Sequence, residues 1–190
     1  YKNLNLIVAH LGGGITISAH KKGKIVDVVS DDEGPFSPER SGRIPVKKVI
    51  DMCYSGKYSY KEMLKKVRGK GGIVAHLDTV DIREVENMIE NGDNEAKLIY
   101  DALIYQVGKG IGELSTVLKG KVDEIILTGG IAYSKNLTKE LEERVKFIAP
   151  VNVLPGENEL EALSYGILRI LRGQENYREY EEKSLAEELI

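Results

Sequence analysis

The sequence has little cysteine, no long apolar run and no excess of positive charge. Its single cysteine, Cys53, excludes an internal disulfide, and the amphipathic stretch around it predicts a buried, reduced thiol, as suits a cytoplasmic protein. No apolar run approaches the roughly 18 residues that a membrane-spanning helix needs. The net charge of −3 indicates no basic surface for nucleic acid. We therefore expect a globular protein that binds neither a membrane nor nucleic acid.

The sequence also lacks an initiator methionine, an internal repeat and a low-complexity linker. Its first strand is expected by residue 4, almost directly after Tyr1, which predicts a piece of a longer protein. Its 190 residues, of which 42% are hydrophobic, are enough for one good core and a small subdomain.

The first 30 residues predict two consecutive β-hairpins. The three strand-like runs are rich in β-branched residues and alternate in polarity, and short loops with glycine separate them. These runs are residues 4–10, 15–19 and 24–29.

The loop of the first hairpin contains three glycines in a row, Gly12, Gly13 and Gly14. Glycine permits positive φ angles and leaves the peptide N–H groups open to an approaching anion. The hairpin tip is therefore a candidate phosphate cradle, to which the His10 side chain could add a donor. A plain turn is the alternative, because Gly-rich hairpins are common.

The segment from Leu6 to Gly23 resembles the second signature of the acetate and butyrate kinases. That signature is a hydrophobic pair, then His-x-Gly-x-Gly-x-Ser/Thr, then a small residue and a glycine. Every fixed position is filled here, by Leu6, Ile7, His10, Gly12, Gly14, Thr16, Ile17, Ala19 and Gly23. In that family the hairpin resembles the second phosphate loop of the actin-like ATPase core. The resemblance implies that the three glycines bind nucleotide phosphates and that His10 acts in catalysis.

A long loop, residues 31–42, follows the third run and contains two prolines and two glycines. Its acidic start, Asp31-Asp32-Glu33, could bind a metal or be solvated, and solvation is the simpler reading. Arg40 offers a planar guanidinium suited to bidentate binding of a carboxylate or phosphate. The sequence Glu-Gly-Pro-Phe-Ser-Pro-Glu-Arg-Ser-Gly resembles the substrate loop of butyrate kinases, whereas acetate kinases have a longer variant. The resemblance implies that Arg40 contacts the acyl carboxylate or the phosphoryl group during transfer.

Residues 57–93 predict a small helical insertion, and Asp81 fits the acidic first turn of one of its helices. In the acetate kinases the matching Asp-x-Arg forms part of the adenosine pocket. The resemblance therefore places Asp81, Ile82 and Arg83 beside the nucleotide. Helix capping is the plain alternative for Asp81, and the two roles are compatible.

The longest helical pattern covers residues 94–118, with Leu98 on its apolar stripe. Three glycines interrupt it, Gly108, Gly110 and Gly112. Since each costs roughly 1 kcal/mol relative to alanine in a helix, close packing against a helix or the sheet is the expected reason. A hinge is the second reading.

A buried strand is predicted over residues 122–128, and a helix over 134–147. The loop between them begins with Gly129, Gly130, Ile131 and Ala132. A strand that runs through glycines into a helix places bare main chain at the carboxyl end of the strand, where open α/β sheets bind ligands. Thr-Gly-Gly-Ile also resembles the adenosine motif of the actin-like superfamily, which implies that these four loop residues bind the nucleotide.

The last predicted unit is a strand over 151–154 and a helix over 159–171. Acidic residues at the start of that helix are expected for dipole reasons alone. The acetate kinases carry a metal-associated glutamate in Asn-Glu-Glu-Leu at this point. On that resemblance Glu159 is the residue expected to serve Mg²⁺, with Glu157, acting through water, as the alternative.

The element order predicts an α/β fold, which the resemblance identifies as a ribonuclease-H-like domain of the actin-type ATPases. We expect a mixed five-stranded sheet with helices on both faces. Residues 1–173 would form the C-terminal nucleotide-binding domain of an acyl kinase, and 174–190 a charged helix or tail. The N-terminal domain of the family would be absent from this chain.

The resemblance implies ATP-dependent phosphorylation of a short-chain carboxylate, butyrate or a branched acid, to an acyl phosphate, or the reverse reaction that forms ATP. ATP or ADP and Mg²⁺ are the implied cofactors, and a homodimer formed through this domain is expected. The alternatives are an acetate or propionate kinase and a non-catalytic module for nucleotide binding or dimerisation.

Overall fold

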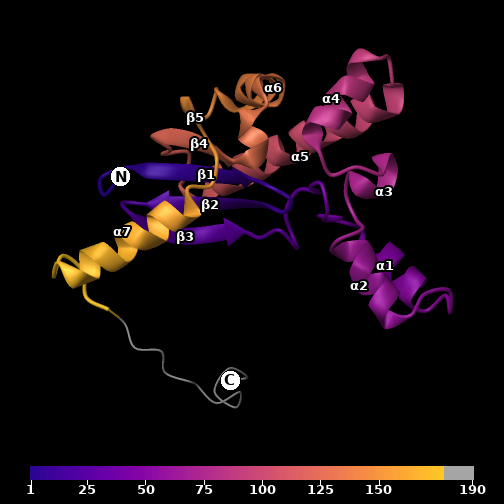
Figure 1. Ribbon diagram of the computed structural model, residues 1–190, viewed down its shortest axis with the longest axis horizontal. Coiled ribbons are helices and arrows are strands. Elements are labelled where there is room, and N and C mark those ends of the chain that lie inside the picture. Colours follow the sequence, from indigo (N-terminus) through magenta and orange to yellow (C-terminus); the bar gives the residue numbers. More distant parts are fainter. Residues whose placement is uncertain (178–190) are drawn as a thin grey trace, which may run out of the picture. The chain divides into compact units, whose positions relative to one another are not determined.

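The computed structural model describes residues 1–177, which fall into two units (Figure 1). The larger unit, Tyr1–Gly156, contains the whole sheet and the hydrophobic core. The second unit begins at Glu157. Among the described residues, none of the helices combines the length and the apolar character that crossing a membrane requires.

The sheet has five strands in the order β3-β2-β1-β4-β5. The strands are β1 (Asn5–Leu11), β2 (Ile15–Lys21), β3 (Lys24–Val29), β4 (Glu124–Gly129) and β5 (Val151–Pro155). The first three form two antiparallel hairpins, as predicted, while β4 runs parallel to both β1 and β5. The mixed five-stranded sheet is therefore confirmed.

Eight helical segments lie among the described residues, and four of them begin at a capping side chain. They are α1 (Val46–Cys53), α2 (Tyr60–Val67), α3 (Val74–Leu77), α4 (Ile82–Glu90), α5 (Asn94–Val117), the 3₁₀ turn η1 (Gly130–Tyr133), α6 (Lys135–Val145) and α7 (Glu159–Leu171). Ser59 and Glu62 form a capping box at α2, and the Asp81, Asp93 and Ser134 side chains cap α4, α5 and α6.

The core lies between one face of the sheet and α5. Alternate residues of the central strands, such as Ile7, Ile17 and Leu127, are fully buried on this face, as the period of two requires. Each such side chain stabilises the fold by about 1.5–3 kcal/mol. Helices α4 and α6 pack on α5, whereas α1, α2 and α3 lie beside the sheet (Figure 1). A helix on the other face of the sheet stays a prediction.

Two of the three glycines inside α5 are explained by close packing. A Cβ on Gly108 would lie 2.5 Å from Cδ of Arg144 in α6, and one on Gly110 would lie 2.5 Å from Cδ1 of Ile17 in β2. The space around Gly112 is open. Leu98 is exposed rather than part of the buried stripe.

The prediction for Cys53 is wrong, because this residue is exposed. It ends α1, a short helix without any buried residue. The amphipathic pattern of the segment was real, but α1 lies beside the sheet rather than on it (Figure 1).

In the second unit, α7 begins and ends where the sequence predicts. Asn158, at its N-terminus, has the left-handed conformation that asparagine tolerates, with φ of 43°. Of the predicted charged helix or tail, residues 174–190, the part from 178 onward lies outside the described residues.

Candidate active site

The carboxyl ends of β1, β4 and β5 lie together, because these neighbouring strands run parallel. His10, near the end of β1, is level with Thr128 near the end of β4. The loop that follows β1, residues 12–14, and the 3₁₀ turn that follows β4 therefore leave the sheet at the same edge. This is the edge at which open α/β sheets bind their ligands.

The glycine loop of the first hairpin is a tight turn with an exposed tip. The N–H of Gly12 donates to the carbonyl of Gly14 at 3.2 Å, and Gly13 between them is exposed. None of the three glycines adopts the positive φ that glycine permits. The missing side chain of Gly12 leaves room for His10, because a Cβ on Gly12 would lie 3.3 Å from Nε2 of His10. The imidazole thus lies against the loop.

The two glycines after β4 have different roles. Gly129 has φ of 93°, and a Cβ on it would lie 2.4 Å from the carbonyl oxygen of Leu11, so the fold itself requires glycine there. Gly130 has no positive φ and nothing within 4 Å of its Cβ position. Its bare main chain faces open space, as a site for an adenine or ribose would need. The Ala132 side chain is buried, so only its main chain could meet a ligand.

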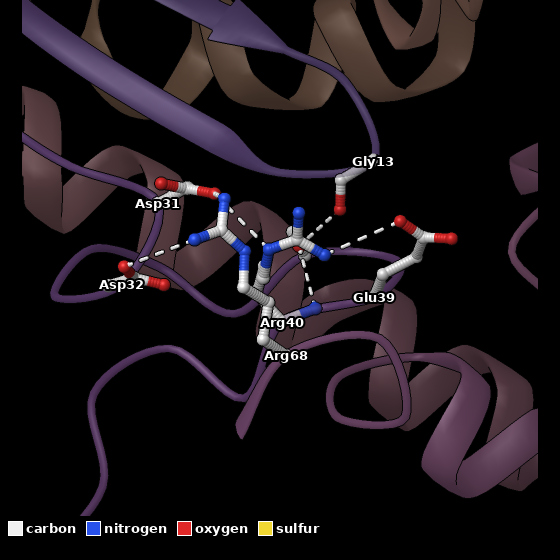
Figure 2. Close-up of polar contacts among 7 residues, drawn as sticks. Gly13, Asp31, Asp32, Glu39, Arg40 and Arg68 are labelled. Atoms are coloured by element: carbon white, nitrogen blue, oxygen red, sulfur yellow. Dashed lines mark hydrogen bonds and ion pairs between the residues drawn. The ribbon is translucent and has the colours of Figure 1, made fainter. Parts of the chain in front are cut away.

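Arg40 is held by two carboxylates, one on each side of its guanidinium (Figure 2). Its Nε donates to Oδ2 of Asp31 at 3.2 Å, and its Nη1 donates to Oε2 of Glu39 at 3.4 Å. The Arg40 side chain is only 16% exposed. The arginine predicted to clamp the transferred group is therefore oriented within the site rather than extended into solvent.

Hydrogen bonds tie the loop of Arg40 to the glycine loop. The carbonyl of Gly13 accepts from the hydroxyl of Ser37 at 2.6 Å and from the N–H of Glu39 at 3.2 Å. The same Ser37 oxygen accepts from the N–H of Arg40 at 3.0 Å. The structure thus brings together Arg40 and the glycine loop, each of which the resemblance implies in phosphate or phosphoryl binding. Beside Arg40, the hydroxyl of Ser41 is buried without a hydrogen-bond partner among the described residues.

The segment after α2 packs tightly under the loop of Arg40. Gly69 donates its N–H to the carbonyl of Glu39 at 2.8 Å, and Ile73 donates to the carbonyl of Ser37 at 3.0 Å. Gly72 has φ of 69°, and a Cβ on it would lie 1.9 Å from the carbonyl oxygen of Ser37. These contacts make the loop a fixed support for the arginine.

Sequence reasoning missed two members of this cluster, Asp31 and Arg68. Arg68 forms an antiparallel bridge with Arg40, and the two guanidinium groups lie side by side (Figure 2). Arg68 reaches Asp31 at 3.5 Å and Asp32 at 3.7 Å. Solvation of the acidic start is therefore confirmed for Asp32 and Glu33, which are exposed, and wrong for Asp31, which is partly buried and pairs with both arginines. The glycine-rich segment after Arg68 was the available signal, since such segments permit close backbone approach.

The Asp-x-Arg residues lie at the N-terminus of α4. Asp81 caps the helix and pairs with Arg83, and its bonds to that arginine lower the pKa of the Asp81 carboxyl to about 2. The capping role is thereby confirmed. The side chain of Ile82 is part of the core, so this residue could offer a nucleotide only its main chain.

A partly buried polar contact joins α4 to the turn after β4. The carboxylate of Glu86, one turn after Arg83, accepts from the hydroxyls of Ser134 at 2.5 Å and Tyr100 at 2.7 Å. Burial, together with this carboxylate, raises the pKa of the Tyr100 hydroxyl. The two segments predicted to hold adenosine are thus linked, although no motif in the sequence distinguishes Glu86.

Among the described residues, no cluster of three or more His, Cys, Asp or Glu side chains could hold a metal ion. Glu159 lies in the first turn of α7, with Glu161. Glu157 precedes that helix.

Residues 1–154 match the acetokinase family. The chain belongs to this family. Its fold is similar to acetate kinase from Porphyromonas gingivalis (TM-score 0.80, 22% identity), covering 88% of this chain and 49% of that one. Acetate kinase from Entamoeba histolytica gives a TM-score of 0.77 at 22% identity, covering 87% and 51%. Propionate kinase from Francisella tularensis gives 0.73 at 24%, covering 83% and 47%.

Acetokinase membership and these neighbours establish the actin-like ATPase fold that the sequence predicted. The chain spans about half the length of these solved structures. The family is one of kinases that use a carboxylate as phosphoryl acceptor.

Proposed function

We propose that this chain forms the nucleotide-binding half of a kinase that transfers a phosphoryl group between ATP and a short-chain carboxylate. The observation that carries the proposal is the edge where β1 and β4 end. There the exposed tip at Gly13, the open main chain of Gly130 and the fixed guanidinium of Arg40 belong to one acetokinase domain.

The proposed chemistry relies on positioning and charge, as phosphoryl transfer does. The amides of the glycine loop would hold nucleotide phosphates, and His10 would donate to them. The turn from Gly129 to Ala132, with Asp81 and Arg83, would hold adenosine. Arg40 would bind the oxygens of the transferred group, on which negative charge is concentrated.

Magnesium, when bound with the nucleotide, would neutralise phosphate charge. We propose Glu159 as its carboxylate in this chain, with Glu157 acting through water as the alternative. Acids at a helix start also stabilise the helix dipole, so a Glu159→Gln variant should be assayed for Mg²⁺ dependence as well as stability.

For the acceptor we propose butyrate or a branched short-chain acid. The support is the compact loop Glu-Gly-Pro-Phe-Ser-Pro-Glu that precedes Arg40. Acetate or propionate is supported equally by the solved neighbours, which are acetate and propionate kinases. Turnover of the complete enzyme with acetate, propionate, butyrate and isobutyrate would decide between them.

The complete enzyme would need a complementary domain, since the chain spans about half of its solved relatives. A second copy bound through this domain and a cytoplasmic location both stay predictions. We expect the 190-residue chain alone to bind nucleotide and to form no acyl phosphate.

The test is calorimetric titration of the chain with Mg²⁺-ADP, repeated with Gly130→Val. Because the space around Gly130 is open, valine fits the fold and should abolish binding by occupying the ligand's place. Gly112→Ala, at an equally open position on α5, is the matched control and should leave binding unchanged. Equal ADP affinity of Gly130→Val and the wild type would contradict the nucleotide site.

A non-catalytic module is the rival reading. In a complete kinase that contains this sequence, Arg40→Ala should lower turnover by about a hundredfold or more, the usual effect of losing one transition-state charge contact. Unchanged turnover in a folded variant would favour the module.

A further inference from the structure

We propose that Asp31 is the residue that positions the guanidinium of Arg40, and that Glu39 competes internally for the anion that Arg40 binds. The ligand class is an oxyanion, a phosphoryl group or a carboxylate. This inference rests on the proposed function for the role of Arg40, but its geometry stands on the contacts in Figure 2.

Asp31 is built into the site as a fixed partner. Its side chain is 24% exposed, and it accepts from Nε of Arg40 at 3.2 Å. A Cβ on Gly14 would lie 2.9 Å from Oδ2 and 3.0 Å from Cβ of Asp31. The third glycine of the loop therefore leaves room for this carboxylate. Because Asp31 occupies the Nε side, a ligand would meet the guanidinium at its Nη1 and Nη2 end, where Nη1 now bonds to Glu39.

A second cation helps to hold Asp31. Arg68 lies 3.5 Å from the same Oδ2, and its backbone bridge to Arg40 keeps the two arginines together. The main chain of Arg40 is fixed as well, through its N–H bond to Ser37. With the main chain fixed, only the direction of the guanidinium can still vary. The hydrogen bond to Asp31 fixes that direction.

Glu39 is placed differently. Its side chain is 41% exposed, and its bond to Nη1 of Arg40 is the longer one, at 3.4 Å. Its Oε2 lies 3.2 Å from the position of a Cβ on Gly13, so the carboxylate covers the exposed tip of the glycine loop. An oxyanion held by both the loop and Arg40 would need this place. Glu39 must then move aside, whereas Asp31 stays.

Three variants that each remove one negative charge separate these roles. Asp31→Asn, Glu39→Gln and Asp32→Asn each favour anion binding by a comparable Coulombic amount. Differences in phosphate affinity among the three variants therefore report the contacts that each side chain makes. Asp32 is the control, because its ion pair is with Arg68 and not with Arg40. The probes are inorganic phosphate, titrated calorimetrically, and the Nε–Hε NMR signal of Arg40 in the 190-residue chain.

We expect phosphate affinity to fall in the order Glu39→Gln, Asp32→Asn, Asp31→Asn. Asp31→Asn should be about tenfold weaker than Asp32→Asn, the value of one charge-assisted hydrogen bond. Glu39→Gln should be about threefold tighter than Asp32→Asn, since an exposed ion pair is weak. The Arg40 signal should shift or broaden without phosphate in Asp31→Asn only, which a general loss of stability would not produce.

Equal affinities of the three variants, or an unchanged Arg40 signal in Asp31→Asn, would overturn the inference. The inference would also be overturned if phosphate left the Arg40 signal of the wild-type chain unchanged. Mg²⁺-ADP titration of the same samples distinguishes failure of this inference from failure of the proposed function. ADP binding without the expected order rejects only the roles of Asp31 and Glu39, while the expected order without ADP binding rejects the nucleotide site.

Discussion

Single residues at the sheet edge differ in how much their substitution should destabilise the fold. Gly129 and Gly130 give the clearest contrast. Gly129→Ala combines a positive φ with a contact of 2.4 Å to the main chain of Leu11, so we expect a loss of about 3 kcal/mol in unfolding free energy. Gly130→Ala should stay within about 0.5 kcal/mol of the wild type. Urea denaturation of both variants measures the difference. Equal midpoints would contradict the assigned geometry.

His20 gives a pH dependence with a definite sign. Burial lowers the pKa of its imidazole, whose Nε2 bonds to the Ser18 hydroxyl at 2.9 Å. The unfolded chain therefore binds a proton more readily, so this contribution to stability is present above about pH 6.5 and lost as pH falls. We expect the thermal midpoint to drop between pH 7.5 and 5, and to drop less in His20→Gln. Identical pH profiles of the two proteins would rule out this histidine as the cause.

At the scale of elements, the link between α4 and the turn after β4 depends on one carboxylate. Glu86→Ala leaves the buried Tyr100 hydroxyl without its partner, which should cost about 1–3 kcal/mol. Tyr100→Phe in the same chain removes that hydroxyl and should recover part of the loss. A double-mutant cycle in urea measures this coupling. Additive effects would mean that the contact contributes little.

The elements themselves were largely predictable, because their signals are local. The two hairpins, α5 and α7 follow from period and glycine turns, and their bounds agree within a residue or two. The exposure of Cys53 and Leu98 could not be predicted, because an amphipathic pattern does not say whether a neighbour covers the apolar side. The residues of the candidate site likewise divide into those with a local sequence signal and those without one. Motif glycines and Arg40 were found, whereas Asp31, Arg68 and Glu86 gain significance only from partners between 9 and 48 residues away.

At the scale of the whole molecule, ligand binding should raise the free energy of unfolding. If the chain binds Mg²⁺-ADP, ligand at 100 times its dissociation constant adds about 2.7 kcal/mol to the unfolding free energy. AMP at the same concentration should raise the thermal midpoint less, because it lacks the phosphate that the glycine loop would hold. Equal shifts with ADP and AMP would place the binding on the adenosine side alone.

The packing of Gly72 under Ser37 also limits how this sequence can vary. Gly72 lies in a glycine-rich segment without a catalytic group, yet any side chain there would meet the carbonyl oxygen of Ser37. Lys70, two residues earlier, is exposed. In a saturation-mutagenesis library selected for kinase function, position 70 should therefore accept most amino acids. Position 72 should be as intolerant as position 40, so a screen for catalytic residues would mistake this glycine for one of them.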